Sequence, residues 1–274
     1  MHMSIEWRQV AVIASKEWRD RLRNRWVLAV ALVFAVFALA IAYFGAAQQG
    51  QVGFHGIEAT IASLASLVIY LVPLIALILG YDTIVGERER GALELLLTMP
   101  ISRLEVLLGK YLGLAAALTS ATAIGFGAGL LPLFSELSVA EGWRYAGFVG
   151  SAVLMGLAFL SIAMLISVWA RDRVRASGTA LALWFFFVLV FDLLLMGALV
   201  ASQGGISSGV FAALLMLNPA DVFRLLNVFS SDQAQGMYGL ATVMPSAWTH
   251  PAVLVAVMLG WMLLPFYFAH RRFS

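Results

Sequence analysis

The chain has 274 residues, of which 62% are hydrophobic and only 12% carry a charged side chain. Soluble globular proteins average about 45–50% apolar and about 25% charged residues, so this composition excludes an ordinary soluble enzyme and indicates an integral membrane protein. The formal net charge is only +2, and the absence of cysteine excludes disulfides, thiolate metal sites and cysteine nucleophiles.

Residues 1–25 are basic and periodic. Apolar side chains recur there at every third or fourth position, between six lysine and arginine residues. A basic amphipathic helix of this kind, which also carries tryptophan, is typical of the anionic surface of a membrane. We therefore expect an interfacial helix over residues 1–25, with packing on another soluble surface as the alternative.

Six apolar segments follow, each close to the ~20 residues that a helix needs to cross a bilayer. They lie at about 26–46, 59–81, 104–131, 145–169, 177–201 and 251–269. The expected fold is a single all-α transmembrane domain over residues 1–274, with six transmembrane helices. In the third span, Gly125 and Gly129 have small-xxx-small spacing, which predicts close helix approach within the chain or across a dimer.

Lysine and arginine are unevenly distributed between the connecting regions. Fifteen of the 17 lie before residue 26, in 82–110, in 170–176 or in the last four residues. The positive-inside rule predicts that these regions and both termini are cytoplasmic, and that 47–58, 132–144 and 202–250 face outward. In a bacterial inner membrane, 202–250 would then be a periplasmic segment.

The polar stretch between the second and third spans is patterned. Leu93, Leu96 and Leu97 fall at i, i+3 and i+4, whereas charged side chains fall on the opposite side, at Glu87, Arg90 and Glu94. This predicts one short amphipathic helix over 87–97, ended by Pro100, which lacks a backbone N–H. Ser102 and Glu105 have capping-box spacing and predict the start of the next helix.

The sequence GERERGALELLLTMPISR (86–103), followed by Gly109-Lys110, resembles the membrane subunits of ABC-2 type transporters. In that family, the short helix between the second and third spans is the coupling helix, which docks on a separate ATPase subunit. The resemblance implies that the ATPase contact consists of Glu87, Arg88, Glu89, Arg90, Leu93, Glu94, Leu96 and Leu97. An ordinary solvated loop helix is the alternative.

The chain has no Walker A sequence, because Gly109-Lys110 lacks the earlier glycine and is followed by Tyr111. We therefore expect no catalytic residue and no bound cofactor in this chain, with ATP and Mg on the partner ATPase. The four histidines show no metal-binding spacing and the methionines form no cluster, so no metal site is expected either.

Asp192 lies within the fifth apolar segment. An ionisable group in a membrane span is costly unless it is paired, faces water or is protonated. Asp192 is therefore an intramembrane candidate, either for a conduit or switching interface, or for a structural hydrogen bond to a Ser or Thr hydroxyl.

The segment 202–250 contains a helix signal. Asn218 is an N-cap residue, Pro219 occupies the first helical position, and Asp221 lies in the first turn. An apolar stripe follows at Val222, Leu225, Leu226 and Phe229. We expect a periplasmic partner to be contacted by Asn218, Asp221, Arg224 and Leu225. The lipid interface or the ends of the spans are the alternatives for covering the stripe.

Three further stretches, GAAQQGQVGFHGIEATIASLASL (45–67), FVLVFDLLL (187–195) and LNPADVFRLLNV (217–228), resemble the permeases of NosDFY-type ABC systems, which mature nitrous oxide reductase. The resemblance implies a homodimer in membrane lipid, a NosF-like ATPase and a NosD-like periplasmic partner, without nucleic acid. It also implies sulfur supply or copper handling for the copper–sulfide cluster. The alternatives are an ABC-2 exporter of a lipid-linked or drug-like cargo, and a secondary transporter or intramembrane enzyme.

Overall fold

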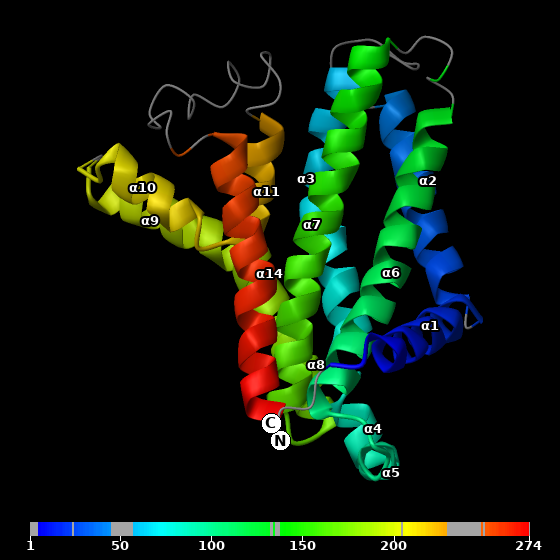
Figure 1. Ribbon diagram of the computed structural model, residues 1–274. Coiled ribbons are helices and arrows are strands. Elements are labelled where there is room, and N and C mark those ends of the chain that lie inside the picture. The colour runs from blue at the N-terminus through cyan, green and yellow to red at the C-terminus, as the bar shows by residue number, and fades with distance from the viewer. Residues whose placement is uncertain are drawn as a thin grey trace.

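The computed structural model describes residues 5–23, 25–44, 57–131, 134, 138–203, 205–228, 248 and 250–273. These residues form helices joined by turns, without a strand among them. The long helices stand together as a bundle, and one helix, α1, lies across one end of it (Figure 1). The expected all-α membrane fold is therefore confirmed.

The helices in chain order are α1 (Trp7–Arg23), α2 (Trp26–Phe44), α3 (Ile57–Gly80), α4 (Val85–Glu89), α5 (Ala92–Leu97), α6 (Arg103–Leu130), α7 (Val139–Trp169), α8 (Arg173–Phe185), the π-helical segment η3 (Phe186–Val190), α9 (Phe191–Ala201), α10 (Ser208–Leu215), α11 (Pro219–Val228) and α14 (Pro251–Phe273).

Five helical stretches of the described chain are long and apolar enough to cross a membrane: Ser63–Glu89, Arg103–Leu130, Val139–Trp169, Arg173–Ala201 and Pro251–Phe273. They correspond to the second to sixth predicted spans. The predicted interfacial helix and first span are the separate helices α1 and α2, which meet at a bend of 63°.

The helix that contains the predicted fourth span begins at a capping box. Ser138 Oγ accepts a hydrogen bond from Glu141 N, and the Glu141 side chain accepts one from Ser138 N, so α7 begins at Val139. Residues 139–144 of the predicted loop 132–144 are thus helical. Residues 47–56 of the first predicted outer loop, and 229–247 of the third, lie outside the described residues.

Part of the predicted outer segment 202–250 is helical. Its helices α10 and α11 are apolar enough to enter the membrane as a pair, and they meet at 112°. With 8 and 10 residues, they are only about 12 and 15 Å long, too short to cross the ~30 Å hydrocarbon core singly. Trp261, midway along α14, donates a hydrogen bond to Met216 O in the turn between them (3.0 Å). By length and composition, the pair therefore fits a re-entrant loop, and we call it the re-entrant pair.

The glycines of α6 allow two helices to approach it closely. A Cβ atom built on Gly125 would lie 2.4 Å from Phe34 Cβ, and one on Gly129 would lie 2.4 Å from Ala38 Cβ, both on α2. Gly113 has the same role toward α1, where a Cβ would lie 2.6 Å from Glu17 Cβ. The predicted small-residue pair therefore packs within the chain.

The start of α1 and the end of α14 lie at the same end of the bundle as α4 and α5 (Figure 1). Glu6 N donates to Glu105 Oε1 (2.6 Å), and Arg103 Nη1 donates to Phe273 O (2.7 Å), so both meet the start of α6. We call this end the basic end, because it gathers the arginine-rich regions of the sequence, and we call the opposite end the far end.

Candidate functional site

The candidate site is the connection between α3 and α6 at the basic end. It contains two short helices, α4 and α5, so the prediction of one continuous helix over 87–97 is wrong. Gly91 separates them with a φ of 70°, a left-handed backbone conformation that glycine adopts without steric cost. The spacing of the leucines gives no sign of this break. The predicted cap of the following helix is confirmed, because Ser102 and Glu105 form a capping box.

The start of α4 is held against the end of α7. Ile84 N and Val85 N both donate hydrogen bonds to Ser167 Oγ, at 2.8 and 3.1 Å. Arg88 donates to two backbone carbonyl groups at the end of α7, those of Ala170 (3.1 Å) and Val168 (3.3 Å). These contacts satisfy backbone groups on both elements, so α4 has a fixed position on the bundle.

The start of α8 holds the same segment from a second side. Arg173 forms a two-pronged ion pair with Asp82, and its backbone N–H donates to Glu89 Oε1 (2.8 Å). A Cβ atom on Gly86 would collide with the Asp82 carboxylate, so a larger residue there would displace the carboxylate from its position. Asp82 is thus one of the residues that hold α4 to its neighbours, and we call these contacts together the clamp.

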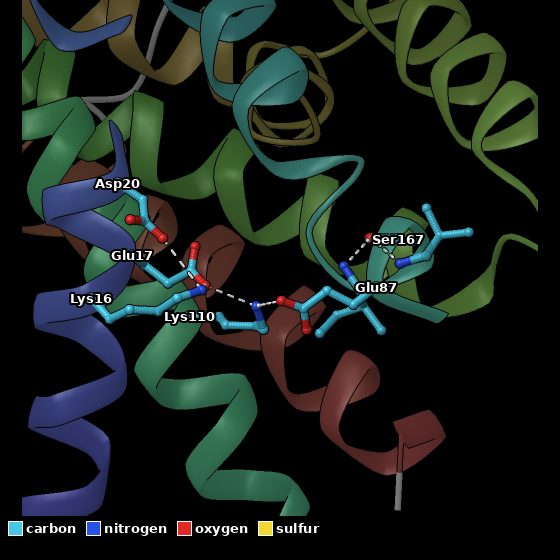
Figure 2. Close-up of polar contacts among 8 residues, drawn as sticks. Lys16, Glu17, Asp20, Glu87, Lys110 and Ser167 are labelled. Carbon is cyan, nitrogen blue, oxygen red and sulfur yellow. Dashed lines mark hydrogen bonds and ion pairs between the residues drawn. The ribbon is translucent and has the colours of Figure 1, made fainter. Parts of the chain in front are cut away.

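The third attachment of α4 is a buried cation. Lys110 Nζ of α6 donates to Glu87 Oε1 (2.6 Å) and to Glu17 Oε1 of α1 (2.9 Å), as Figure 2 shows. The Lys110 side chain is only 3% exposed. A buried charge is tolerated when it is paired, so Lys110 ties α1, α4 and α6 together. Sequence reasoning missed this pairing, although a lysine at the start of an apolar span is itself a signal that an anionic partner is near.

The outward face of the site differs from the predicted one. Leu93 is 5% exposed, and Leu96 and Leu97 are half-buried against the protein's own core. The apolar side chains that face outward are Leu95 (68% exposed) and Met99 (52% exposed).

The predicted charged residues divide in the same way. Glu87, Arg88 and Glu89 form contacts within the chain, whereas Arg90 and Glu94 are exposed beside Leu95. The site is therefore a rigidly held projection with a small apolar and charged outer face.

A second charged cluster lies inside the membrane part of the bundle. Arg224 Nη2 donates to Asp192 Oδ2 (2.9 Å), and its Nη1 donates to Asp221 Oδ1 (2.8 Å). The sequence assigned Asp192 and Arg224 to different sites, and the structure brings them together. The partner of Asp192 is thus a guanidinium group, and not the Ser or Thr hydroxyl that was one of the two alternatives.

Most of the side chains predicted to contact a partner on α11 are buried. Leu225 is 5% exposed, and Asn218 and Asp221 are each 1% exposed, because α11 packs against α14, α7 and α3. The apolar stripe is covered by the chain's own spans, which was one of the alternatives; Phe229 of that stripe lies outside the described residues. In the described part of the chain, no group of three or more His, Cys, Asp or Glu side chains is arranged to hold a metal ion.

Residues 11–274 match the family described as ABC-2 family transporter protein. A Pseudomonas aeruginosa protein named "Probable ABC transporter permease protein NosY" is 48% identical over 242 residues, which cover 86% of this chain and 88% of that protein. A Stutzerimonas stutzeri protein of the same name is 44% identical over 277 residues, which cover 97% of this chain and 99% of that protein.

Proposed function

Because this chain belongs to the ABC-2 transporter family and is a permease subunit, we propose that α4 and α5 form its docking element for a separate ATPase subunit. ATP and Mg would be bound by that ATPase subunit and not by this chain. The basic end would then be cytoplasmic, in agreement with the positive-inside rule, and the membrane would be the bacterial inner membrane.

The observation that carries this proposal is the combination of a fixed inner face and a free outer face. Ser167, Arg173 and Lys110 hold α4 to α7, α8 and α6, while Leu95 and Met99 face outward. A displacement applied to such a segment is passed to several spans, because the clamp does not let it move alone. A solvated loop helix does not need attachments to three helices.

The names of the relatives and the resemblance in 45–67, 187–195 and 217–228 support a proposal for the partners and the substrate. We propose that the chain acts as a homodimer with NosF-like ATPase subunits and a NosD-like periplasmic partner. The complex would transport a sulfur species or handle copper for the copper–sulfide cluster of nitrous oxide reductase. Because Leu225 is buried, we propose that the periplasmic partner contacts another part of the chain.

The docking element is tested by Leu95→Asp. A carboxylate placed in a desolvated apolar contact costs several kcal/mol, so we expect the affinity of the permease for its ATPase to fall at least 30-fold, which corresponds to about 2 kcal/mol. Co-purification of the ATPase from detergent-solubilised membranes, and ATP turnover of the complex, are the measurements.

The control is Arg272→Glu, which introduces negative charge at an exposed position of the same end, on α14. It should leave the ATPase bound. Full retention of the ATPase by Leu95→Asp would contradict the proposal, and equal loss from both variants would show that the charge of the whole basic end, rather than α5, governs binding.

A further inference from the structure

The fifth span changes its helical geometry where it leaves the bundle. α8 is held to the bundle, because Trp184 Nε1 donates to Tyr70 O of α3 (2.9 Å). The π-helical segment η3 follows, a type of turn that is rare and is concentrated at functional sites. Beyond it, α9 has no buried residue and projects with α10 to one side of the bundle (Figure 1).

Two side chains of the re-entrant pair contact this span. Asn218, just before α11, contacts it inside η3, and Arg224, on α11, contacts it just after η3. Asn218 Nδ2 donates to Phe187 O within η3 (2.8 Å). Arg224 Nη2 donates to Asp192 Oδ2, in the first turn of α9 (2.9 Å). Among the described residues, Asp192 links α9 to α11 through this ion pair and through a side-chain contact with Asp221.

The re-entrant helix itself is firmly placed. Asp221 accepts hydrogen bonds from both Asn218 Nδ2 (2.9 Å) and Arg224 Nη1 (2.8 Å), and it is 1% exposed. The indole of Trp261 fixes the turn before it. Hydrogen bonds to charged groups are strengthened where water is excluded. The bundle on one side of η3 is therefore held in place. On the other side, α9 and α10 form an arm that has few contacts with the rest of this chain.

We propose that η3 is a hinge in the fifth span, and that Asn218 and Arg224 are positioning residues that set the angle of the arm formed by α9 and α10. The carboxylate of Asp221 explains how the ion pair between Arg224 and Asp192 can break. When Asp192 leaves, Arg224 keeps Asp221 as its partner, so no guanidinium is stranded in the membrane. The Asp192 side chain is 34% exposed, so the bundle does not enclose it. The part that this movement plays in transport rests on the proposed function.

The hinge is tested by distance measurements between spin labels. The chain has no cysteine, so labels can be placed at Met196→Cys on α9 and Leu263→Cys on α14 without removing native thiols; these positions are 67% and 59% exposed. The permease is measured alone in lipid nanodiscs, with labelled chains diluted by unlabelled ones. We expect one narrow distance distribution in the parent, and a broadened, shifted distribution after Asp192→Leu.

Three controls separate positioning from general damage. Asp192→Glu keeps the charge and should restore the parent distribution, and Leu193→Ala, at an exposed neighbour on α9, should not change it. A second label pair within the bundle, Val139→Cys with Leu263→Cys, should be unaffected by Asp192→Leu. A distribution between α9 and α14 that Asp192→Leu leaves unchanged would overturn the proposal. An equal change in both label pairs would also overturn it, because it would assign Asp192 to the stability of the whole bundle.

The role of the hinge in transport needs the complex with the ATPase. Trapping that complex with a non-hydrolysable ATP analogue should shift the distance between α9 and α14 relative to the nucleotide-free complex. No shift would overturn the transport role of the arm while leaving the docking of α5 intact. Failure of the docking proposal, by contrast, would be seen as unchanged ATPase binding in Leu95→Asp.

Discussion

Lys110 lies where three helices meet, and its charge is balanced by two carboxylates from different elements. The exposed fractions of the three side chains are 3% for Lys110, 9% for Glu17 and 16% for Glu87. Removing one partner of a buried ion pair leaves an uncompensated charge, which costs more than the pair itself contributes. The position of α4 therefore depends on a residue of α6 that has no contact with solvent.

We expect Lys110→Met to destabilise the protein by about 3–5 kcal/mol, because Glu87 would lose its cation and Glu17 would keep only the longer ion pair with Lys16 (3.4 Å). The apparent midpoint of thermal unfolding in detergent is the measurement. The triple variant Lys110→Met, Glu17→Gln, Glu87→Gln removes all three charges and should recover most of the loss. If the single and triple variants unfolded at the same temperature, the buried charge would not be the cause.

Sequence reasoning identifies charged residues inside spans, but it does not pair them. Asp192 and Arg224 are 32 positions apart, and their meeting depends on the re-entrant turn between them. Lys110 and Glu17 are 93 positions apart, on helices whose approach depends on Gly109 and Gly113. Such pairs are decided by tertiary geometry, so composition and spacing show only that a partner is needed.

The packing of α6 is decided by glycines on one of its faces. Gly125 is in contact with α2, whereas a Cβ atom on Gly127, two residues further, would meet nothing within 4 Å. The two positions have the same helical backbone and differ in what lies opposite them.

We expect Gly125→Ala to destabilise the protein by about 1–3 kcal/mol through overpacking against Phe34 and Ala31. The matched control Gly127→Ala should be neutral or stabilising by up to about 1 kcal/mol, because alanine is the better helix former. Thermal unfolding of both variants in one detergent checks this. A Gly125→Ala protein as stable as Gly127→Ala would mean that α2 moves aside at no cost.

The spans could be predicted because an apolar run of bilayer length has few other structures open to it. The short elements could not. Eight to ten apolar residues suit a surface helix as well as a re-entrant one, so length and composition do not by themselves place α10 and α11. In the candidate site, leucine periodicity was read as a docking face, although Leu93 packs inward and Leu95 faces outward. Amphipathicity indicates two faces without telling which of them meets the protein's own core.

At the scale of the whole molecule, the basic end joins the docking element to four helices, and the far half holds the re-entrant pair and the arm (Figure 1). The helices α6, α7 and α14 run between these two regions. Movement at the basic end can thus reach the far end through continuous helices, which is the arrangement that a permease driven by a separate ATPase requires.

The central claim is that the outer face of α5 contacts the ATPase, and a photo-crosslinking amino acid at Leu95 tests it most directly. In the intact complex, we expect position 95 to crosslink to the ATPase subunit. The same probe at Leu93, 5% exposed, and at Leu217, 55% exposed in the turn between α10 and α11, should capture no ATPase. Capture from 95 alone would support the account. Absence of the ATPase product at 95, or equal capture from all three positions, would contradict it.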